Sequence, residues 1–569
     1  MKLLRILIIV LCLALLFGAG WLWWSWPGKV DMAAYAPANS LVYLEFNSLT
    51  DIADAIQHND TWRALAPALG NKASFDSHWW HSIVRAGIGP TDNVVFTRAQ
   101  VALVVTGLNS VEEAETLRVR PEAALIIETH TSHWRVKSAA TNAVKRLATF
   151  AYGQAVCTER TTDADFVDCA LPQSERRIVA AIDGSMVVIS NSDTAVRDCL
   201  EVRHGLRPSL QTDTELLRVR QGVSNNKSLA FGYVSSTNSA RLFSWAAPMM
   251  LGRAPGDQQL EQVLTSSATK ILRGIAWSSQ PASGGIEDRF LFSLEPAVVT
   301  RLGPAFQTGS TAEEFWKLVP DSSQSLTIYR SQNPQTAWNA LDQAVAFKLD
   351  ALSAIVFSSL LKSGLAVYGV ENPNELLPTL SAPLVTVRPN ANAEGSIFIA
   401  HILNQEQLRH ALTQQIISGG HGQILEGTKT DPDPKKELTA LIIDDYLILG
   451  KTENVQTSLY AIRRGEVANA ACQKQISHFA PQSNAAILTY ANDEKRLSSF
   501  VSVISTLRPS PLSPEELASL KSVIKNSSFS ATETNLASNG IERKTRSAFG
   551  QFSTLLSLMQ QDTATNLLH

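Results

Sequence analysis

Hydrophobic and polar residues alternate in short runs along most of this chain, and several runs occur twice in the same order. Residues 41–44 and 326–329 each follow a proline and precede a helical stretch. The runs 125–127 and 397–399 continue the parallel, each ahead of another helical stretch. Alternation with a period of two is typical of half-buried β-strands. The pattern therefore predicts two related units.

The clearest match pairs residues 182–188 with residues 443–449. Both segments show a strand pattern, a two-residue polar turn and a second strand pattern, which predicts a β-hairpin followed by a helix. Near the end of each unit, residues 285–287 match residues 540–542. A shared order of this kind indicates an internal duplication.

These matches place a first extracytoplasmic unit at residues 33–302 and a second at residues 311–558. Residues 303–310 contain Gly, Pro and Ser and suit a linker, and residues 559–569 form a tail. Each unit combines alternating strands with amphipathic helices. The expected fold class is α+β: an N-terminal transmembrane helix followed by two related units with largely antiparallel sheets and packed helices.

Two helices of the second unit are expected in detail. Apolar residues recur every three or four positions from Trp338 to Leu360, which predicts one long helix with one apolar face. Ser513 precedes Pro514 and lies three residues before Glu516, the pattern of a capping box at a helix start.

The chain begins with an apolar segment. Residues 6–26 contain no charge and follow Lys2 and Arg5, and as a helix they would span about 31 Å, close to the thickness of a bilayer's hydrocarbon core. Basic residues before such a segment stay in the cytoplasm, so residues 1–5 are expected inside and the rest of the chain outside. Four tryptophans suit the outer membrane interface: Trp21, Trp23, Trp24 and Trp26.

A secretory signal peptide is the alternative for this segment. Small residues at 18–20 would suit cleavage, but the apolar run continues beyond them. The length favours a signal anchor, which would place the protein in the cell membrane as a single-pass protein in contact with lipid.

Composition narrows the class of partner. The chain has 569 residues, of which 45% are hydrophobic and 18% charged, and its formal net charge is −3. These values are ordinary for globular domains. Basic residues are dispersed and form no stripe that could follow a phosphate backbone, so nucleic acid is not an expected partner.

Cys157 and Cys169 are the close pair among five cysteines. They flank a polar segment that is expected to form a turn, and an oxidising compartment would permit a disulfide between them. Their spacing is wider than the C-x-x-C of redox and zinc sites, which favours a structural bridge.

With these features in view, the sequence resembles an uncharacterised bacterial family of N-terminally anchored envelope proteins that share a domain of unknown function. The resemblance rests on residues 37–46, the hairpin at residues 182–190, residues 229–233 and the closing run at residues 540–550. It implies a location and a fold, and it brings no catalytic residues.

Four patterns suggest chemistry, and each has a simpler explanation. His78 and His81, like His130 and His133, are three residues apart, but no third metal ligand is evident. Ser522 and Lys525 fit S-x-x-K without its companion motifs. The remaining two patterns are the glycine-rich residues 418–422, without a P-loop lysine, and the apolar residues 242–251, which suit a core helix.

The sequence therefore predicts a non-catalytic binding or scaffolding protein of the cell envelope, with an unidentified envelope protein or ligand as partner. No cofactor or metal is expected. Two alternatives stay open: an extracytoplasmic hydrolase of unrecognised type, and a carrier or chaperone for an apolar ligand.

Overall fold

The computed structural model describes most of the chain beyond residue 27. The described residues are 28–69, 93–96, 99–113, 116–172, 174, 176–239, 268–309, 314–349, 351–418, 420–468, 484–506, 512–527 and 529–555. The predicted anchor at residues 6–26, with Trp21, Trp23, Trp24 and Trp26, lies outside them.

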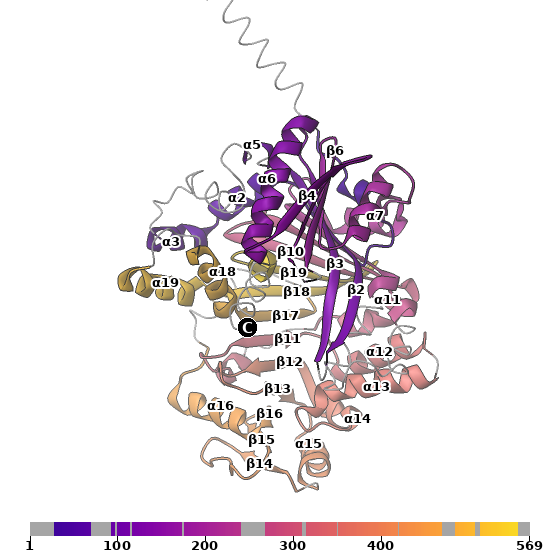
Figure 1. Cartoon of the computed structure of the whole chain (residues 1–569). Helices are drawn as coiled ribbons and strands as arrows, with labels where there is room; N and C mark the ends of the chain where they lie inside the picture. The colour runs from indigo at the N-terminus through magenta and orange to yellow at the C-terminus, as the bar shows by residue number, and fades with distance from the viewer. Residues whose placement is uncertain are drawn as a thin grey trace, which may run out of the picture.

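One sheet of 19 strands runs through the described structure (Figure 1). Every ladder is antiparallel except the one between β14 and β15. The first ten strands, from one edge to the middle, are β4 (Val156–Thr161), β5 (Asp165–Ala170), β6 (Arg177–Asp183), β7 (Met186–Ser190), β3 (Thr116–Glu128), β2 (Gln100–Glu113), β1 (Val42–Phe46), β8 (Ala230–Ser235), β9 (Leu272–Ala282) and β10 (Gly285–Leu294).

The other nine strands continue to the far edge. They are β19 (Gly540–Ser547), β18 (Phe529–Ala537), β17 (Ile487–Asn492), β11 (Ser325–Tyr329), β12 (Leu380–Arg388), β13 (Ile397–Ile402), β16 (Tyr446–Lys451), β15 (Leu438–Ile443) and β14 (Gly422–Glu426). We call β1–β10 and their helices the first half, and β11–β19 with theirs the second half. From β10 to β6 and from β19 to β15, the strands follow each other in the same topological order. Beyond them the halves differ, since the first adds β5 and β4 antiparallel and the second adds β14 parallel to β15.

The two halves meet at a seam between β10 and β19. Eight residue pairs align antiparallel across it, from Ile286 opposite Ser547 to Ser293 opposite Gly540. The strands that meet are the last of each half, so the arrangement matches that of a two-fold symmetric dimer with an antiparallel interface. The backbone hydrogen bonds of the seam join the halves into one sheet.

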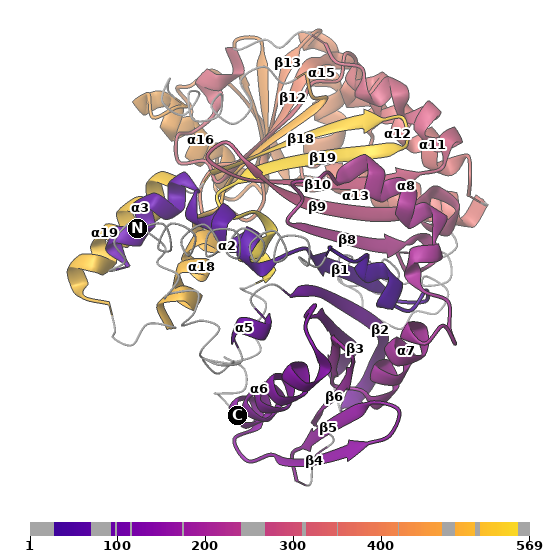
Figure 2. The same ribbon diagram turned by 90° about the horizontal axis from the view of Figure 1, so that it is seen from above.

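Helices pack on both faces and beside the strand ends (Figure 2). Those of the first half are η1 (Met32–Tyr35), α2 (Leu49–Gln57), α3 (Asp60–Ala68), α5 (Asn93–Phe96), α6 (His133–Tyr152), α7 (Asp193–Arg203), η2 (Leu210–Thr212), α8 (Thr214–Val223), α11 (Pro296–Leu302) and η3 (Gly303–Phe306). Those of the second half are η4 (Glu314–Leu318), α12 (Pro334–Ala346), α13 (Ala351–Ala366), α14 (Pro373–Leu376), η5 (Leu377–Thr379), α15 (Gln405–Leu412), η6 (Thr413–Ile417), α16 (Thr452–Arg464), α18 (Glu494–Thr506) and α19 (Pro514–Ser527).

A shared hydrophobic core holds helices of both halves together. Trp62 of α3 packs with Phe500 of α18 and Leu520 of α19. The ring of Phe549, just beyond β19, stacks on Phe500 at 4.1 Å and meets Trp62 edge-on at 6.4 Å. Burial of such large apolar side chains contributes about 1.5–3 kcal/mol each. The halves therefore share side-chain packing as well as a sheet.

Local sequence signals explain several elements. The hairpins β6–β7 and β15–β16 form at the two predicted positions, with positive φ at Gly184 (63°) and Asp444 (50°). Two-residue hairpin turns require such angles, which Gly and Asp tolerate. The capping box is confirmed as well, since Ser513 N donates to Glu516 Oε2 at 2.8 Å and Glu516 N to Ser513 Oγ at 3.2 Å.

The expected fold class was wrong. It placed a transmembrane helix ahead of two units with sheets of their own, whereas the described strands form one continuous sheet. Among the helices that the structure describes, none combines the length and apolar character needed to cross a membrane. Sequence matching found the repeat of strands but not the pairing of β10 with β19.

The single long helix expected from Trp338 to Leu360 was also wrong. The chain forms α12 and α13 instead, which lie against each other, and Ser358 Oγ on α13 donates to Asp342 on α12 at 2.5 Å. Apolar side chains recur at helical spacing in both helices, so the periodicity does not reveal the break between them.

Candidate functional site

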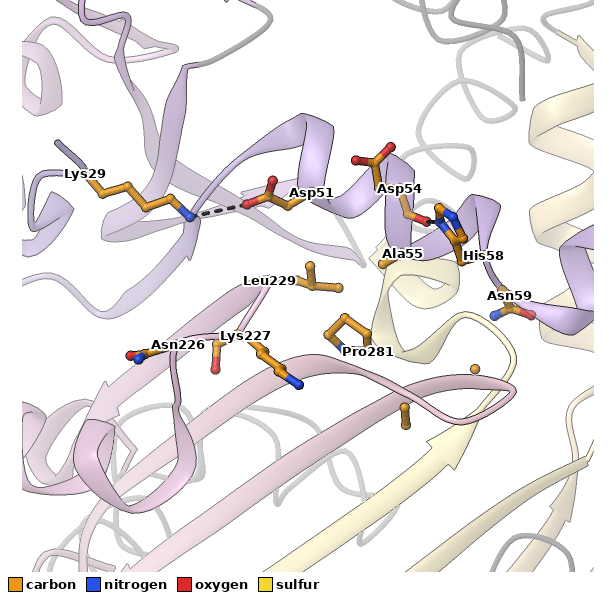
Figure 3. A pocket seen from close by; sticks show the side chains of 13 residues that line it. Lys29, Asp51, Asp54, Ala55, His58, Asn59, Asn226, Lys227, Leu229 and Pro281 are labelled. Carbon is orange, nitrogen blue, oxygen red and sulfur yellow. Dashed lines mark hydrogen bonds and ion pairs between the residues drawn. The ribbon is translucent and has the colours of Figure 1, made fainter. Parts of the chain in front are cut away.

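A polar cavity of about 410 Å³ lies in the first half, below α2 (Figure 3). Three segments line it besides α2: the chain before η1, the loop before β8, and the turn between β9 and β10. Its size falls within the range of about 300–1,000 Å³ that is usual for small-molecule sites. We consider it the candidate functional site.

The helix α2 supplies one wall. Asp51, Asp54 and His58 lie at spacings of three and four residues, so they share one side of the helix. Ser48 fixes the start of the helix, since its Oγ accepts a hydrogen bond from Asp51 N at 3.2 Å. His58 Nδ1 lies 2.7 Å from the main-chain oxygen of Asp54, which positions the imidazole at the helix end.

The loop before β8 supplies the opposite wall, with Lys227 on it. Asn225 shapes this loop, because its Oδ1 accepts from Lys227 N at 2.8 Å and its main-chain N donates to Ser228 Oγ at 2.9 Å. Asn47 Nδ2 donates to the main-chain oxygen of Ser228 at 2.9 Å. These bonds fix the loop, so Lys227 is presented from an ordered backbone.

The base of the cavity connects to the seam. Gly285 lies on the cavity wall, and a Cβ at that position would collide with the main-chain oxygen of Ser547. Asn59 Oδ1 caps α3 by accepting from Thr61 N at 2.8 Å, while its Nδ2 donates to the main-chain oxygen of Ala548. The site therefore rests on residues of both halves.

Charges of both signs face the cavity. Lys29 Nζ lies 3.3 Å from Asp51 Oδ2, and both side chains are about half exposed, at 58% and 50%. An exposed pair of this kind contributes about 0–1 kcal/mol, so a ligand can displace it at low cost. Lys227 and Asp54 add one charge of each sign. The arrangement suits a partner that carries both positive and negative groups.

No catalytic arrangement is evident among the described residues that line this cavity. Ser228 is the hydroxyl among the described lining residues, and its Oγ accepts a hydrogen bond from Asn225 N and is not hydrogen-bonded to His58 or to the Asp side chains of the cavity. Nor does the described part of the chain gather three or more His, Cys, Asp or Glu side chains that could hold a metal ion. The geometry supports binding.

Cys157 and Cys169 form a disulfide with an S–S distance of 2.05 Å. They lie opposite each other in the β4–β5 hairpin, at the edge of the sheet. Cys169 is fully buried, whereas most of β4 is exposed. The bridge fastens an exposed edge strand to the sheet and lies apart from the polar cavity. Cys199 is free and buried, and burial raises the pKa of its thiol to about 12.

The histidine patterns do not form a shared site in the described residues. His130 Nε2 lies 2.9 Å from Gln100 Oε1, whereas His133 Nε2 lies 3.0 Å from Asp165 Oδ2. Each histidine thus has its own partner. His78 and His81 lie outside the described residues.

The remaining candidate motifs are also apart from the cavity. Ser522 and Lys525 are exposed on α19. The described residues of 418–422 follow η6 and lead into β14, at the far edge of the second half. Residues 242–251 lie outside the described part of the chain.

The sequence reasoning missed every charged residue of the cavity. One signal was available: Asp51, Asp54 and His58 form a polar stripe along a short helix. No local sequence pattern indicates that Lys29 and Lys227 line the cavity, because tertiary structure alone brings these residues to α2.

Comparison with known proteins assigns no family to the chain. No family model matches the chain. No curated protein matches it either. A solved structure titled "Structure of crystal form I of TP0453" is similar over 47% of this chain and 81% of its own, with 11% identity and a TM-score of 0.23. A likeness at that level supports no conclusion about fold or function. The family resemblance noted from the sequence stays a prediction.

Proposed function

We propose that this chain is a non-catalytic binding or scaffolding protein of the cell envelope, and that its folded part works outside the cytoplasm. The observation that supports this most directly is the polar cavity, where charges of both signs converge. A partner with paired charges, such as a segment of an envelope protein, fits this chemistry.

Two further features support the proposal. The disulfide at the exposed sheet edge suits an oxidising compartment, because cytosolic thiols are kept reduced. The continuous sheet gives a scaffold on which the walls of the cavity stay fixed relative to each other. Contact of residues 6–26 with membrane lipid stays a prediction from the sequence.

Photo-crosslinking in intact cells tests the docking role. A photoreactive phenylalanine analogue replaces Asp54 or Lys227 in the full-length protein, and the same analogue replaces the exposed Glu406 on α15 as a control. We expect the same discrete crosslinked species from both cavity positions and none from the control. Crosslinking that is equal at all three positions, or absent from the cavity, would refute docking at this site.

A second candidate function has its own observation. The second half has a partly open apolar cavity, which supports the carriage of an apolar ligand. The hydrolase alternative stays a prediction from the sequence.

A further inference from the structure

The second half has a partly open cavity of about 350 Å³ between the sheet and the helices α12 and α13. The strands β11 and β12 supply Tyr329 and Thr386, and the helices supply Trp338 and Leu365. Tyr368 and Phe398 also line it, with ring centroids 5.9 Å apart. Small-molecule sites typically combine such an apolar lining with a few fixed polar groups.

The polar groups of this cavity are uncharged. None of its described lining residues is Asp, Glu, Lys, Arg or His, and its hydroxyls belong to Tyr329, Ser331, Tyr368 and Thr386. Burial, with Tyr329 nearby, raises the pKa of Tyr368 to about 12, so its phenol stays neutral. A charged ligand group would lose its hydration here without gaining an opposite charge.

The duplication gives an internal comparison for this cavity. The turns β9–β10 and β18–β19 align Gly285 with Gly540, and the ladders then make Phe46 on β1 the equivalent of Tyr329 on β11, since Phe46 pairs with Ala230 and Tyr329 with Ile487. In the first half this place is filled: Phe46 and Ala230 pack in the cluster that contains Trp62, and the ring of Phe46 lies 6.5 Å from that of Phe552. The second half is thus open at a position where the first half is packed.

The first half has a separate apolar cavity of about 240 Å³, which lies two residues farther along the same strands, at Leu44, Gly232 and Trp277. The ring of Trp277 lies 6.4 Å from that of Phe290, and both line this smaller cavity. The two apolar cavities therefore lie at different places in the repeated fold.

In each half, one side of the apolar cavity is formed by the segment that follows the last strand of the other half. Thr554 and Leu555, which follow β19, line the first-half cavity, and Ala305 and Phe306, which follow β10, line the second-half cavity. Both cavities are thus bordered by the chain that crosses from one half to the other. A partly open, mostly apolar pocket of this size suits a small molecule.

We propose that the second-half cavity binds an uncharged, lipid-like molecule, whose apolar chain or ring system lies among Trp338, Leu365 and Phe398 and whose hydroxyl or carbonyl group reaches Tyr329 and Thr386. The apolar lining and the neutral hydroxyls together define this chemistry. The site lies in the other half from the polar cavity, so this inference goes beyond the proposed docking role and does not depend on it.

Photoaffinity labelling of the full-length protein tests the proposal. The probe is a diazirine derivative of dodecanol, and adducts are mapped by peptide mass spectrometry. We expect adducts concentrated on the peptides that contain Trp338 and Leu365. The blocking variant is Gly364→Trp, since a Cβ at Gly364 on the cavity wall meets no atom within 4 Å and glycine is a poor helix residue. Labelling of the cavity peptides should fall about tenfold or more.

Matched variants make the result decisive. Ser359→Trp places the same side chain on an exposed position of α13 and should leave labelling unchanged. Ala337→Phe fills the cavity from α12 and should reproduce the loss. Uniform adducts, or cavity labelling that survives both filling variants, would overturn the site. Equal labelling by the diazirine derivative of dodecanoic acid would overturn the preference for an uncharged ligand. Replacing Asp54 in the polar cavity should change none of these results.

Discussion

Asp288 is a buried carboxylate at the seam, and its titration should be measurable as a change in stability. Its side chain is fully buried on β10. Trp277 Nε1 donates to Asp288 Oδ1 at 2.9 Å, and Gln551 N donates to Asp288 Oδ2 at 2.9 Å. Burial disfavours the charged form and raises the pKa of Asp288 to about 6, although the hydrogen bonds from Trp277 and Gln551 lower it.

The direction and size of the effect follow from this pKa. Because the folded protein holds the proton more tightly than the unfolded chain, whose Asp pKa is near 3.8, Asp288 favours folding below pH 3.8. This contribution is lost as the pH rises through about 6. At about 1.4 kcal/mol for each pH unit, the difference amounts to about 3 kcal/mol.

Urea titrations of the wild type and Asp288→Asn from pH 3.5 to pH 8, followed by tryptophan fluorescence, measure this contribution. Asparagine keeps the shape of the side chain and cannot titrate. Any cost of its altered hydrogen bonds is the same at each pH, so it cancels from the slope. We expect the unfolding free energy of the wild type, minus that of the variant, to fall by about 2.4 kcal/mol between pH 4 and pH 7, since part of the total is already lost at pH 4.

The adjacent Glu287 provides a control of opposite sign. Burial alone would raise the pKa of Glu287, but hydrogen bonds from Arg289 at 2.8 Å and Arg546 at 2.9 Å outweigh it and lower the pKa. Its contribution is present above the unfolded pKa and is lost as the pH falls, so Glu287→Gln should give the reverse slope. A difference that is independent of pH for Asp288→Asn, or that has the same sign for both variants, would refute this account.

Three further predictions concern single features of the fold. Replacing Cys157 and Cys169 by Ser, which opens a bridge with a sequence separation of 12, should cost about 3 kcal/mol and accelerate hydrogen exchange mainly in β4 and β5. Gly540 has φ 143°, and a Cβ there would collide with the main-chain oxygen of Phe292, so Gly540→Ala should destabilise the seam by at least about 3 kcal/mol in urea titration. Ser513→Ala removes one half of the capping box and should lower the unfolding free energy by about 1 kcal/mol, with faster exchange confined to α19.

Features that depend on neighbouring residues could be predicted from the sequence. The hairpins at Gly184 and Asp444 and the helix start at Ser513 each need only a few consecutive residues. Cys157 and Cys169 are also close in sequence, and a hairpin of local origin places them opposite each other. These features can be predicted from a single sequence because short-range geometry determines them.

Features that depend on distant pairing could not be predicted. The seam sets Glu287 beside Arg546, 259 residues away, and no periodicity in either strand identifies the other as its neighbour. The polar cavity depends on the same kind of contact, since Lys29 and Lys227 meet α2 through tertiary structure alone. Charged residues dispersed along a sequence of low net charge give no sign of where they converge.

The two halves carry different sites although they share a fold. Equivalent strand positions need not be packed alike, because the side chains and the helices that cover them differ. Phe46 and Ala230 lie in the shared core with Trp62, whereas Tyr329 and Ile487, at the equivalent places, line an apolar cavity. The polar cavity of the first half is lined by α2 and the loop before β8. One half is therefore suited to polar contacts at its surface and the other to an apolar ligand within it, and the continuous sheet holds the two sites at a fixed separation.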